Sequence, residues 1–294
     1  MNSASDAQDR ELKVVEEIEK LGGNLDEEQR KKIAEKIREI RNFVPKIGVF
    51  GKTGAGKSHL CNALFGREVA KISDVGACTR EPQRIVLEAG TSGICLIDVP
   101  GVGESPERDA EYSDLYKRLL PELDIVLWVI KADDRALSVD QVIYRDCVEP
   151  LKKTIPTVFV INQVDKLEPV REWDVAARLP GAKQSENIKD KLADVSRIFD
   201  IEVSQISAVS AAEGYGLSAL VHQIVNTLPN EKKFGVVREA KKENVTPESE
   251  REAERGIWEA IKEFAGKAYE VYKENKETIH TVVAAIWAIF TKKK

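Results

Sequence analysis

The sequence predicts an α/β fold: a mainly parallel sheet with helices on both faces, flanked by helical arms at both ends of the chain. Two observations predict it. Short apolar runs of strand length alternate with segments of helical spacing through the middle of the chain. A glycine-rich loop, Gly51 to Ser58, lies directly between one such run and a helical pattern that continues from His59.

Six apolar runs predict the strands of the sheet. They lie at 46–51, 83–89, 93–99, 124–130, 156–162 and 203–208. The second and third runs are joined at Gly90-Thr91-Ser92, so we expect one antiparallel hairpin in an otherwise parallel sheet. Residues 168–184 contain two prolines and interrupt the pattern before a helix expected near 185–199. The sequence assigns no role to this insertion.

The chain divides into four parts by composition. We expect an N-terminal helical arm over 1–44, an α/β domain over 45–229, a charged linker over 230–246 and a C-terminal amphipathic helical arm over 247–294. A length of 294 residues is compatible with about two domains. The linker is expected because charged residues are dense between Glu231 and Glu243.

Both arms carry apolar residues at helical spacing. In the N-terminal arm, which is broken at Gly22-Gly23, Asn24 and Glu27 have the spacing of a capping box. The apolar stripe that follows consists of Ile33, Ile37, Ile40 and Val44. In the C-terminal arm, Thr246-Pro247 predicts an N-cap and a first turn. Its apolar positions are Trp258, Ile261, Ala265, Ala268, Tyr272, Ile279, Val282, Val283, Ile286, Trp287 and Phe290.

Composition limits the classes of function. A hydrophobic content of 42% is enough for a large core, and a net charge of −5 gives no general attraction to nucleic acid. The four cysteines show no metal-binding spacing, and free thiols indicate a reducing compartment. Residues 1–13 are polar and charged, so we expect no signal peptide and a cytoplasmic protein.

The loop Gly51-Lys52-Thr53-Gly54-Ala55-Gly56-Lys57-Ser58 matches the phosphate-binding pattern G-x-x-x-x-G-K-[ST] at every fixed position. Glycines in such a loop let backbone N–H groups converge on phosphate oxygens, and the N-terminus of the following helix adds partial positive charge. Lys57 would bridge the outer phosphates and the Ser58 hydroxyl would ligate magnesium. The sequence therefore predicts a nucleotide site.

Three further motifs follow strand-like runs and together indicate which nucleotide binds. Asp98-Val99-Pro100-Gly101 has the pattern D-x-x-G, in which the aspartate holds magnesium through water and the glycine N–H contacts the γ-phosphate. Asn162-Gln163-Val164-Asp165 matches N-K-x-D except at Gln163. Residues 210–217 read as S-A-x-x-G-x-G-L. Each motif is weak alone, but their order along the chain indicates a guanine nucleotide.

With these motifs the chain resembles the translation-factor-related GTPases, and within them the Era/TrmE-like branch that includes small bacterial GTPases described as ribosome-binding. The other segments that carry the resemblance are 77–81, 98–105 and 127–137, and it extends over about 44–229. The resemblance implies a P-loop GTPase fold, a six-stranded sheet, and hydrolysis of GTP to GDP and phosphate with Mg²⁺.

The resemblance also implies a role for each motif residue. Lys57, Thr79 and Gly101 would act in catalysis, and Ser58, Thr79 and Asp98 would hold magnesium. Asp165 would accept from the ring imino and exocyclic amino groups of guanine, and Asn162 would contact its carbonyl edge. The residues expected to contact the nucleotide are Gly51, Lys52, Thr53, Gly54, Ala55, Gly56, Lys57, Ser58, His59, Asn162, Gln163, Asp165, Ser210, Ala211 and Ala212.

Three positions depart from the family pattern. Gln163 replaces the usual lysine, so it can stack on the nucleotide but brings no charge. Val102 stands where Ras-like proteins carry the glutamine that orients the attacking water, so we expect slow turnover. Gly54 occupies the position where potassium-activated relatives carry asparagine, which disfavours activation by potassium.

Two classes of function remain open, beside a nucleotide-binding structural protein with negligible turnover, which stays possible because Val102 removes the simplest catalytic residue. In the first, a slow GTPase acts as a nucleotide-gated molecular switch for a macromolecular partner, for which the ribosome is one candidate. In the second, a membrane-associated GTPase resembling interferon-inducible GTPases places its C-terminal helix at a lipid surface. A nucleotide-dependent dimer is compatible with both. A C-terminal arm that packs on the 33–44 helix favours the first, and lipid contact by the Trp- and Phe-containing tail favours the second.

Overall fold

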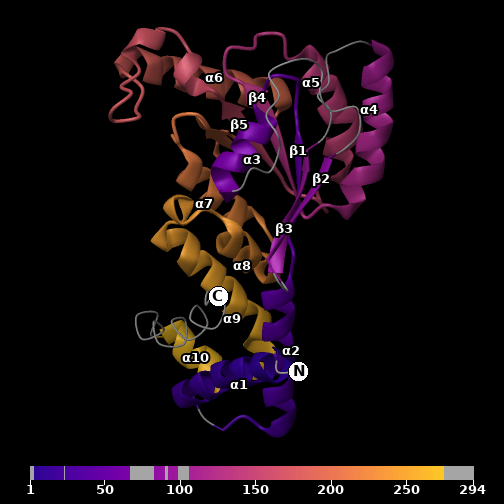
Figure 1. The fold of residues 1–294 in the computed structure, drawn as a ribbon, viewed down its shortest axis with the longest axis vertical. Helices are drawn as coiled ribbons and strands as arrows, with labels where there is room; N and C mark the ends of the chain where they lie inside the picture. The colour runs from indigo at the N-terminus through magenta and orange to yellow at the C-terminus, as the bar shows by residue number, and fades with distance from the viewer. Residues whose placement is uncertain (1–2, 23, 67–82, 90–91, 99–105, 275–294) are drawn as a thin grey trace.

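The structure, a computed structural model, describes residues 3–22, 24–66, 83–89, 92–98 and 106–274 (Figure 1). The helices are α1 (Ser3–Gly22), α2 (Glu27–Asn42), α3 (Lys57–Phe65), α4 (Pro106–Leu119), α5 (Ser138–Ile143), α6 (Ala182–Phe199), α7 (Leu217–Thr227), α8 (Asn230–Glu239), α9 (Pro247–Ala265) and α10 (Lys267–Glu274). The strands are β1 (Lys46–Phe50), β2 (Gln83–Ala89), β3 (Ser92–Asp98), β4 (Ile125–Lys131), β5 (Thr157–Asn162) and β6 (Ile206–Ala208).

The strands form one sheet in the order β2-β3-β1-β4-β5-β6. All neighbours pair in parallel except β2 and β3, which form the expected antiparallel pair. The carboxyl ends of the parallel strands are aligned by the pairs Val49–Asp98, Phe50–Trp128, Lys131–Asn162 and Ile161–Ala208. The loops that follow these strands therefore meet at one edge of the sheet, where ligands bind in open α/β folds.

Helices cover both faces of the sheet, and each face has its own apolar core. Alternate buried residues of β4 point to opposite faces, as expected for a strand that is covered on both sides. On one face, Trp128 and Phe159 pack with residues of α4, α5 and α6. On the other, Val49 and Val160 pack with residues of α3, α7 and α8. The predicted α/β fold with a mainly parallel sheet is confirmed.

The two arms pack against each other in a third apolar core. The α2 stripe of Ile33, Ile37 and Ile40 is buried in one cluster with Trp258 and Ile261 of α9. The cluster also takes in residues of α1, α8 and α10, and Trp258 stacks on Tyr272 with ring centroids 4.7 Å apart. The prediction that the C-terminal arm docks on the N-terminal arm is confirmed as far as residue 274. Residues 275–294, with the apolar positions from Ile279 to Phe290, lie outside the described residues.

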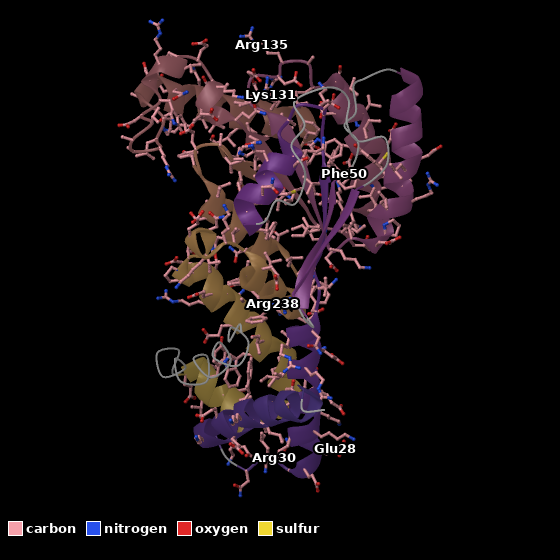
Figure 2. All side chains as sticks on the ribbon, viewed as in Figure 1. Glu28, Arg30, Phe50, Lys131, Arg135 and Arg238 are labelled. Carbon is pink, nitrogen blue, oxygen red and sulfur yellow. The ribbon has the colours of Figure 1, made fainter. Side chains whose placement is uncertain are left out.

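The bundle formed by the arms lies at the end of the molecule opposite to α5 and α6 (Figure 1). It is joined to the sheet where α2 leads into β1. There the Arg238 side chain of α8 donates from Nη2 to the backbone oxygen of Phe43 at 3.0 Å and pairs with Glu239 at 2.7 Å (Figure 2). Both charged side chains are almost fully buried, so this contact fixes the arm at the base of the sheet.

Three local expectations differ from the structure. Residues 230–246, expected to be a charged linker, contain α8, in which Phe234, Val236 and Val237 are buried together with the charged residues Lys233 and Glu239. The capping box of α2 is formed by Asp26 and Gln29, not by Asn24 and Glu27. Residues Val203–Gln205 form a short 3-10 helix, so the last strand begins at Ile206. The expected cap of α9 is confirmed, since Thr246 Oγ1 accepts from Ser249 N at 3.2 Å.

None of the described helices combines the length and the apolar content that crossing a bilayer requires.

Candidate nucleotide-binding site

The phosphate-binding loop joins β1 to α3 at the carboxyl edge of the sheet. Gly51 has φ of 134°, and a Cβ there would lie 2.0 Å from the backbone oxygen of Val129. Gly56 has φ of 81°, and a Cβ there would lie 2.7 Å from Asn162 Nδ2. Any side chain at either position would be strained and would collide with the neighbouring strand or loop. The sequence pattern thus reflects the close approach of the loop to β4 and to the residue that ends β5.

Lys57, Ser58 and His59 form the first turn of α3, which begins directly after Gly56. The Lys57 ammonium folds back over the loop and donates to the backbone oxygens of Gly51 at 3.1 Å and Lys52 at 3.2 Å. Because these are backbone carbonyls of the loop itself, the ammonium lies over the surface where the loop would receive phosphate. The helix N-terminus and the Lys57 charge act on the same side of the loop.

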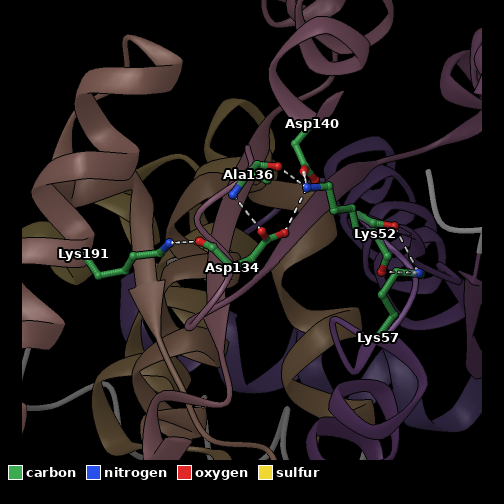
Figure 3. A network of polar contacts seen from close by, with 7 residues as sticks. Lys52, Lys57, Asp134, Ala136, Asp140 and Lys191 are labelled. Atoms are coloured by element: carbon green, nitrogen blue, oxygen red, sulfur yellow. Dashed lines mark hydrogen bonds and ion pairs between the residues drawn. The ribbon is translucent and has the colours of Figure 1, made fainter. Parts of the chain in front are cut away.

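A second lysine of the loop is held by two carboxylates (Figure 3). Lys52 Nζ lies 2.9 Å from Asp134 Oδ2 and 3.0 Å from Asp140 Oδ2, and it also donates to the backbone oxygen of Ala136. Burial alone would lower the pKa of Lys52, but Asp134 and Asp140 outweigh it and raise the pKa. Lys52 is therefore a charged tether between the phosphate loop and the residues from the end of β4 to α5.

The same loop after β4 is anchored from the opposite side by α6. Lys191 donates to the backbone oxygen of Asp134, as Figure 3 shows. Burial lowers the pKa of Lys191 and raises the pKa of Asp140. Burial would also raise the pKa of Asp134, but the interactions of its carboxylate, led by the hydrogen bond from Lys52, together outweigh burial and lower that pKa below its ordinary value. No motif of the sequence indicates this network, because its members are far apart along the chain.

The base-side motif begins at Asn162, the last residue of β5. The Asn162 side chain is 1% exposed. Its Nδ2 donates to the backbone oxygen of Ala55 at 2.9 Å, and its Oδ1 accepts from the N–H of Ala211 at 3.1 Å. Asn162 thus joins the phosphate loop to the loop that follows β6. Ala211 is among the residues expected to contact the nucleotide, and its N–H donates to Asn162 in this structure.

Gln163 and Asp165 continue the motif. Gln163 has φ of 64°, and its Nε2 donates to the backbone oxygen of Gly54 at 2.9 Å. Lys166 Nζ donates to Gln163 Oε1 at 2.8 Å, so a positive charge lies beside the glutamine after all. Asp165 Oδ1 is buried and has no hydrogen-bond partner among the residues that the structure describes.

The loop after β6 carries the last predicted site residues. Ser210 and Tyr215 exchange backbone hydrogen bonds of 3.0 and 3.1 Å, and the Ser210 hydroxyl accepts from the N–H of Glu213 at 3.2 Å. This closed turn keeps Ala211 buried beside Asn162 and leaves Ala212 exposed. The structure therefore brings residues from three separate motifs, those starting at Gly51, Asn162 and Ser210, to one edge of the sheet.

Comparison with known proteins agrees with this geometry. Residues 46–163 match the family model described as 50S ribosome-binding GTPase. The chain is 42% identical over 206 residues to the uncharacterized Escherichia coli protein YfjP, and the match covers 70% of each chain. It is 28% identical over 187 residues to GTPase Era of Aquifex aeolicus. The chain is a GTPase of the Era-like P-loop family.

A solved structure extends the likeness to three dimensions. An Era variant from Aquifex aeolicus bound to GDP·AlF4⁻ matches the GTPase with a TM-score of 0.50 and 26% sequence identity, over 67% of this chain and 66% of that one. The sequence match covers 56% of the length of Aquifex Era and 62% of this chain. The common part is thus the GTP-hydrolysing domain, and both chains contain further segments that the match leaves out.

The remaining predicted site residues of the GTPase belong to the two switch segments. Asp98 is the last residue of β3 and pairs with Val49, two positions before Gly51, so its backbone lies next to the start of the phosphate loop. Thr79, Gly101 and Val102 lie outside the described residues. The assignment of Thr79, Asp98 and Gly101 to magnesium and catalysis stays a prediction.

Proposed function

We propose that this GTPase is a nucleotide-gated molecular switch, which hydrolyses GTP slowly and binds a macromolecular partner in only one nucleotide state. The observation that carries the proposal is the arrangement on the base side. Asn162 joins the phosphate loop to the loop after β6, and Asp165 presents a buried, unpaired carboxylate oxygen close by in the same motif. This arrangement supports the nucleotide binding on which the switch depends, and the switch segments would sense the γ-phosphate.

The Asp165 carboxylate supports guanine as the base. Leaving a buried charged acceptor unpaired costs at least about 1–3 kcal/mol, so Asp165 Oδ1 favours a ligand that brings donors. Guanine offers its ring N–H and its 2-amino group, whereas adenine has no donor at the matching positions. A site of this kind is expected to prefer GTP to ATP by about 10⁴-fold.

Asn162 would act mainly by positioning in this scheme. Its side-chain amide is already hydrogen-bonded to Ala55 and Ala211. Asn162 would therefore contribute to base binding by holding the two loops in place. Gln163 would take the role of the usual lysine. Its side chain donates to the backbone oxygen of Gly54 and accepts from the Lys166 ammonium, which places a positive charge beside it.

Magnesium fits the phosphate side of the site. Ser58 is the second residue of α3, so its hydroxyl belongs to the same helix N-terminus as the N–H groups that receive phosphate. We propose that Ser58 holds Mg²⁺ together with Thr79 and Asp98. The bound ion neutralises charge that develops on the β- and γ-phosphates. Lys57 and the backbone of the loop orient the phosphates for in-line attack by water.

Slow turnover follows from the switch sequence. The side chain of Val102 is apolar, so it cannot accept a proton or hydrogen bond from the attacking water. We propose that a partner, or a group of the switch segments other than Val102, orients this water. Binding of the partner would then depend on the nucleotide state and would also raise the rate of hydrolysis.

A ribosomal particle is the partner that we favour. The supporting observation is the match of residues 46–163 to a family described as ribosome-binding. The test is co-sedimentation of the full chain with ribosomal subunits in GDP and in a non-hydrolysable GTP analogue, with Lys57→Ala as the control that cannot hold nucleotide. We expect co-sedimentation with only one of the two nucleotides. Equal sedimentation in both, or none in either, would contradict the proposed partner.

Membrane contact is the second candidate, and it rests on residues 275–294. The described part of the C-terminal arm supports the first candidate, because Trp258 and Tyr272 are buried among the other helices. Flotation of the same preparation with anionic liposomes distinguishes the two. A chain that floats only in one nucleotide state would make the membrane the partner. The cytoplasmic location and a nucleotide-dependent dimer remain predictions.

A further inference from the structure

Residues 168–184, hereafter the 168–184 segment, connect the base-side motif to α6. The segment contains the short 3-10 helix Val170–Glu172 and an isolated bridge in which Asp174 and Leu179 exchange backbone hydrogen bonds of 2.9 and 3.2 Å. Its end is the first turn of α6. Sequence reasoning assigned no role to it, and the motifs of the GTPase family do not include it.

The end of the segment is bound to the residues that carry Asp165. Gln184 is fully buried, and its Nε2 donates to the backbone oxygens of Asp165 at 3.1 Å and Leu167 at 2.8 Å. One side-chain amide therefore spans the turn that presents the Asp165 carboxylate. Because the two acceptors are backbone atoms, Gln184 constrains the path of the chain at the base-reading residue.

The middle of the segment is bound to the loop after β6. Trp173 is buried and packs its ring edge-on against Tyr215, with centroids 5.6 Å apart. Tyr215 closes the turn with Ser210 that places Ala211 beside Asn162. Arg178 also approaches this turn, since its Nη1 would lie 3.3 Å from a Cβ on Gly214. The segment thus contacts both loops that would enclose the base.

The two contacts are connected to each other by hydrogen bonds at the start of α6. One oxygen of the Glu172 carboxylate accepts from the N–H groups of Lys183 at 3.0 Å and Gln184 at 3.4 Å, at the N-terminus of α6. Gly181 permits this approach, because a Cβ there would lie 2.5 Å from the Glu172 Cβ. Glu172 is the neighbour of Trp173, so the Trp173 and Gln184 contacts are fixed relative to each other.

We propose that the 168–184 segment is a positioning element for base recognition, in which Gln184 sets the placement of Asp165 and Trp173 sets the placement of the 210–215 turn. The inference rests on the proposed role of Asp165 in reading guanine. It deepens that proposal, because it assigns part of the discrimination of the base to residues outside the nucleotide-binding motifs.

The test compares GDP with inosine diphosphate, which has the same phosphates and ring N–H but lacks the 2-amino group that Asp165 would bind. Calorimetry on the full chain gives the ratio of the two affinities for the parent and for Gln184→Met, which keeps the volume of the side chain and removes its donors. We expect the preference for GDP over inosine diphosphate to fall about 5- to 10-fold in Gln184→Met. Without Gln184, Asp165 would no longer be held in place to accept a hydrogen bond from the 2-amino group of guanine. A side chain that only stabilises the fold would leave this ratio unchanged.

A matched control has the same chemistry away from the nucleotide edge. Gln223 Nε2 donates to the backbone oxygen of Ser204 at 2.8 Å, so Gln223→Met removes a comparable contact. This variant is expected to keep the parent ratio. Trp173 provides a second, independent pair: Trp173→Ala should lower the ratio like Gln184→Met, and Trp173→Phe should largely restore it by keeping a ring against Tyr215.

The outcomes separate the two proposals. A parent that prefers GDP over both ADP and inosine diphosphate, with a reduced ratio in Gln184→Met and Trp173→Ala, supports the positioning role. A parent with that preference whose folded variants keep the full ratio overturns the positioning role and leaves the reading of guanine intact. A parent that binds ADP as tightly as GDP overturns the assignment of Asp165 itself. If Gln184→Met does not fold, the Trp173 pair decides.

Discussion

Lys52 Nζ and Asp140 Oδ2 lie 3.0 Å apart in an ion pair that joins the phosphate loop to the first turn of α5. The Asp140 side chain is 2% exposed, and Lys52 contacts Asp134 as well. Since the backbone oxygen of Lys52 also accepts from Lys57, the pair holds the part of the loop that the Lys57 ammonium contacts.

Lys52→Met should destabilise the protein and weaken nucleotide binding. The change leaves the buried Asp140 carboxylate without its cation, and breaking such a pair costs about 3 kcal/mol or more. Urea denaturation and GDP calorimetry measure the two effects. Lys131→Met is the control, because Lys131 and Asp133 form an exposed pair at 3.0 Å, worth about 0–1 kcal/mol. Equal stability of the two variants would show that the Lys52 tether contributes nothing.

Gln163 should contribute to nucleotide affinity through its contact with Gly54. Gln163→Ala removes the 2.9 Å hydrogen bond to the phosphate loop and separates the Lys166 ammonium from it, so we expect the dissociation constant of GDP to rise about 5- to 10-fold. Gln163→Lys should retain parent-like affinity, because a lysine can reach the same oxygen. An unchanged dissociation constant of GDP in Gln163→Ala would mean that the second residue of the N-K-x-D motif does not contribute to nucleotide binding in this protein.

Catalysis should depend on Lys57 and Thr79 and little on Val102. Lys57→Ala is expected to abolish nucleotide binding, whereas Thr79→Ala should leave binding largely intact and lower turnover, because Thr79 would close the site only around γ-phosphate and magnesium. Val102→Ala should change basal turnover only modestly. Phosphate-release kinetics measure all three. A large loss of hydrolysis in Val102→Ala with normal binding would contradict the interpretation of that position.

The helical arms should make stability depend on pH through Glu254 in α9. Burial raises the pKa of Glu254 to about 7, from an ordinary value of 4.5. A raised carboxyl pKa means that the folded state binds the proton more tightly, so the contribution of Glu254 to stability is fully present below pH 4.5 and is lost as pH rises to about 7. Glu254→Gln should match the parent at low pH and be more stable at pH 8, by about 1 kcal/mol, because the half-buried side chain is partly screened by solvent. Identical pH profiles of the unfolding free energy would refute this.

The sequence predicts the parts of the site that backbone geometry restricts to particular residue types. Gly51 and Gly56 are required by positive φ and by contact with neighbouring atoms, so a one-dimensional pattern identifies the loop. The alternation of apolar runs predicts the sheet because strands such as β1, β4 and β5 are buried on both faces. Both signals are local along the chain, and both are confirmed.

The remaining features depend on contacts between distant residues. Lys52 and Asp134 are 82 positions apart, and Gln184 binds Asp165 from the far end of an irregular segment. In α8 the apolar residues are few among many charges. Phe234 is buried against α2 and α9, and Val236 and Val237 are buried against the sheet, α3 and α7. No periodicity or motif identifies such contacts, so the network around Lys52 and the helix at 230–239 were not predicted.

The central claim is that Asp165 reads guanine, and a change of base preference tests it most directly. Asp165→Asn replaces the carboxylate acceptor by an amide that can donate to the 2-oxo group of xanthine. Calorimetry with GTP, ATP and xanthosine triphosphate on the parent and on Asp165→Asn is the measurement. The account predicts a parent that binds GTP far more tightly than ATP, and a variant that prefers xanthosine triphosphate. Tight binding of ATP by the parent, or an unchanged preference for GTP in the variant, would contradict it.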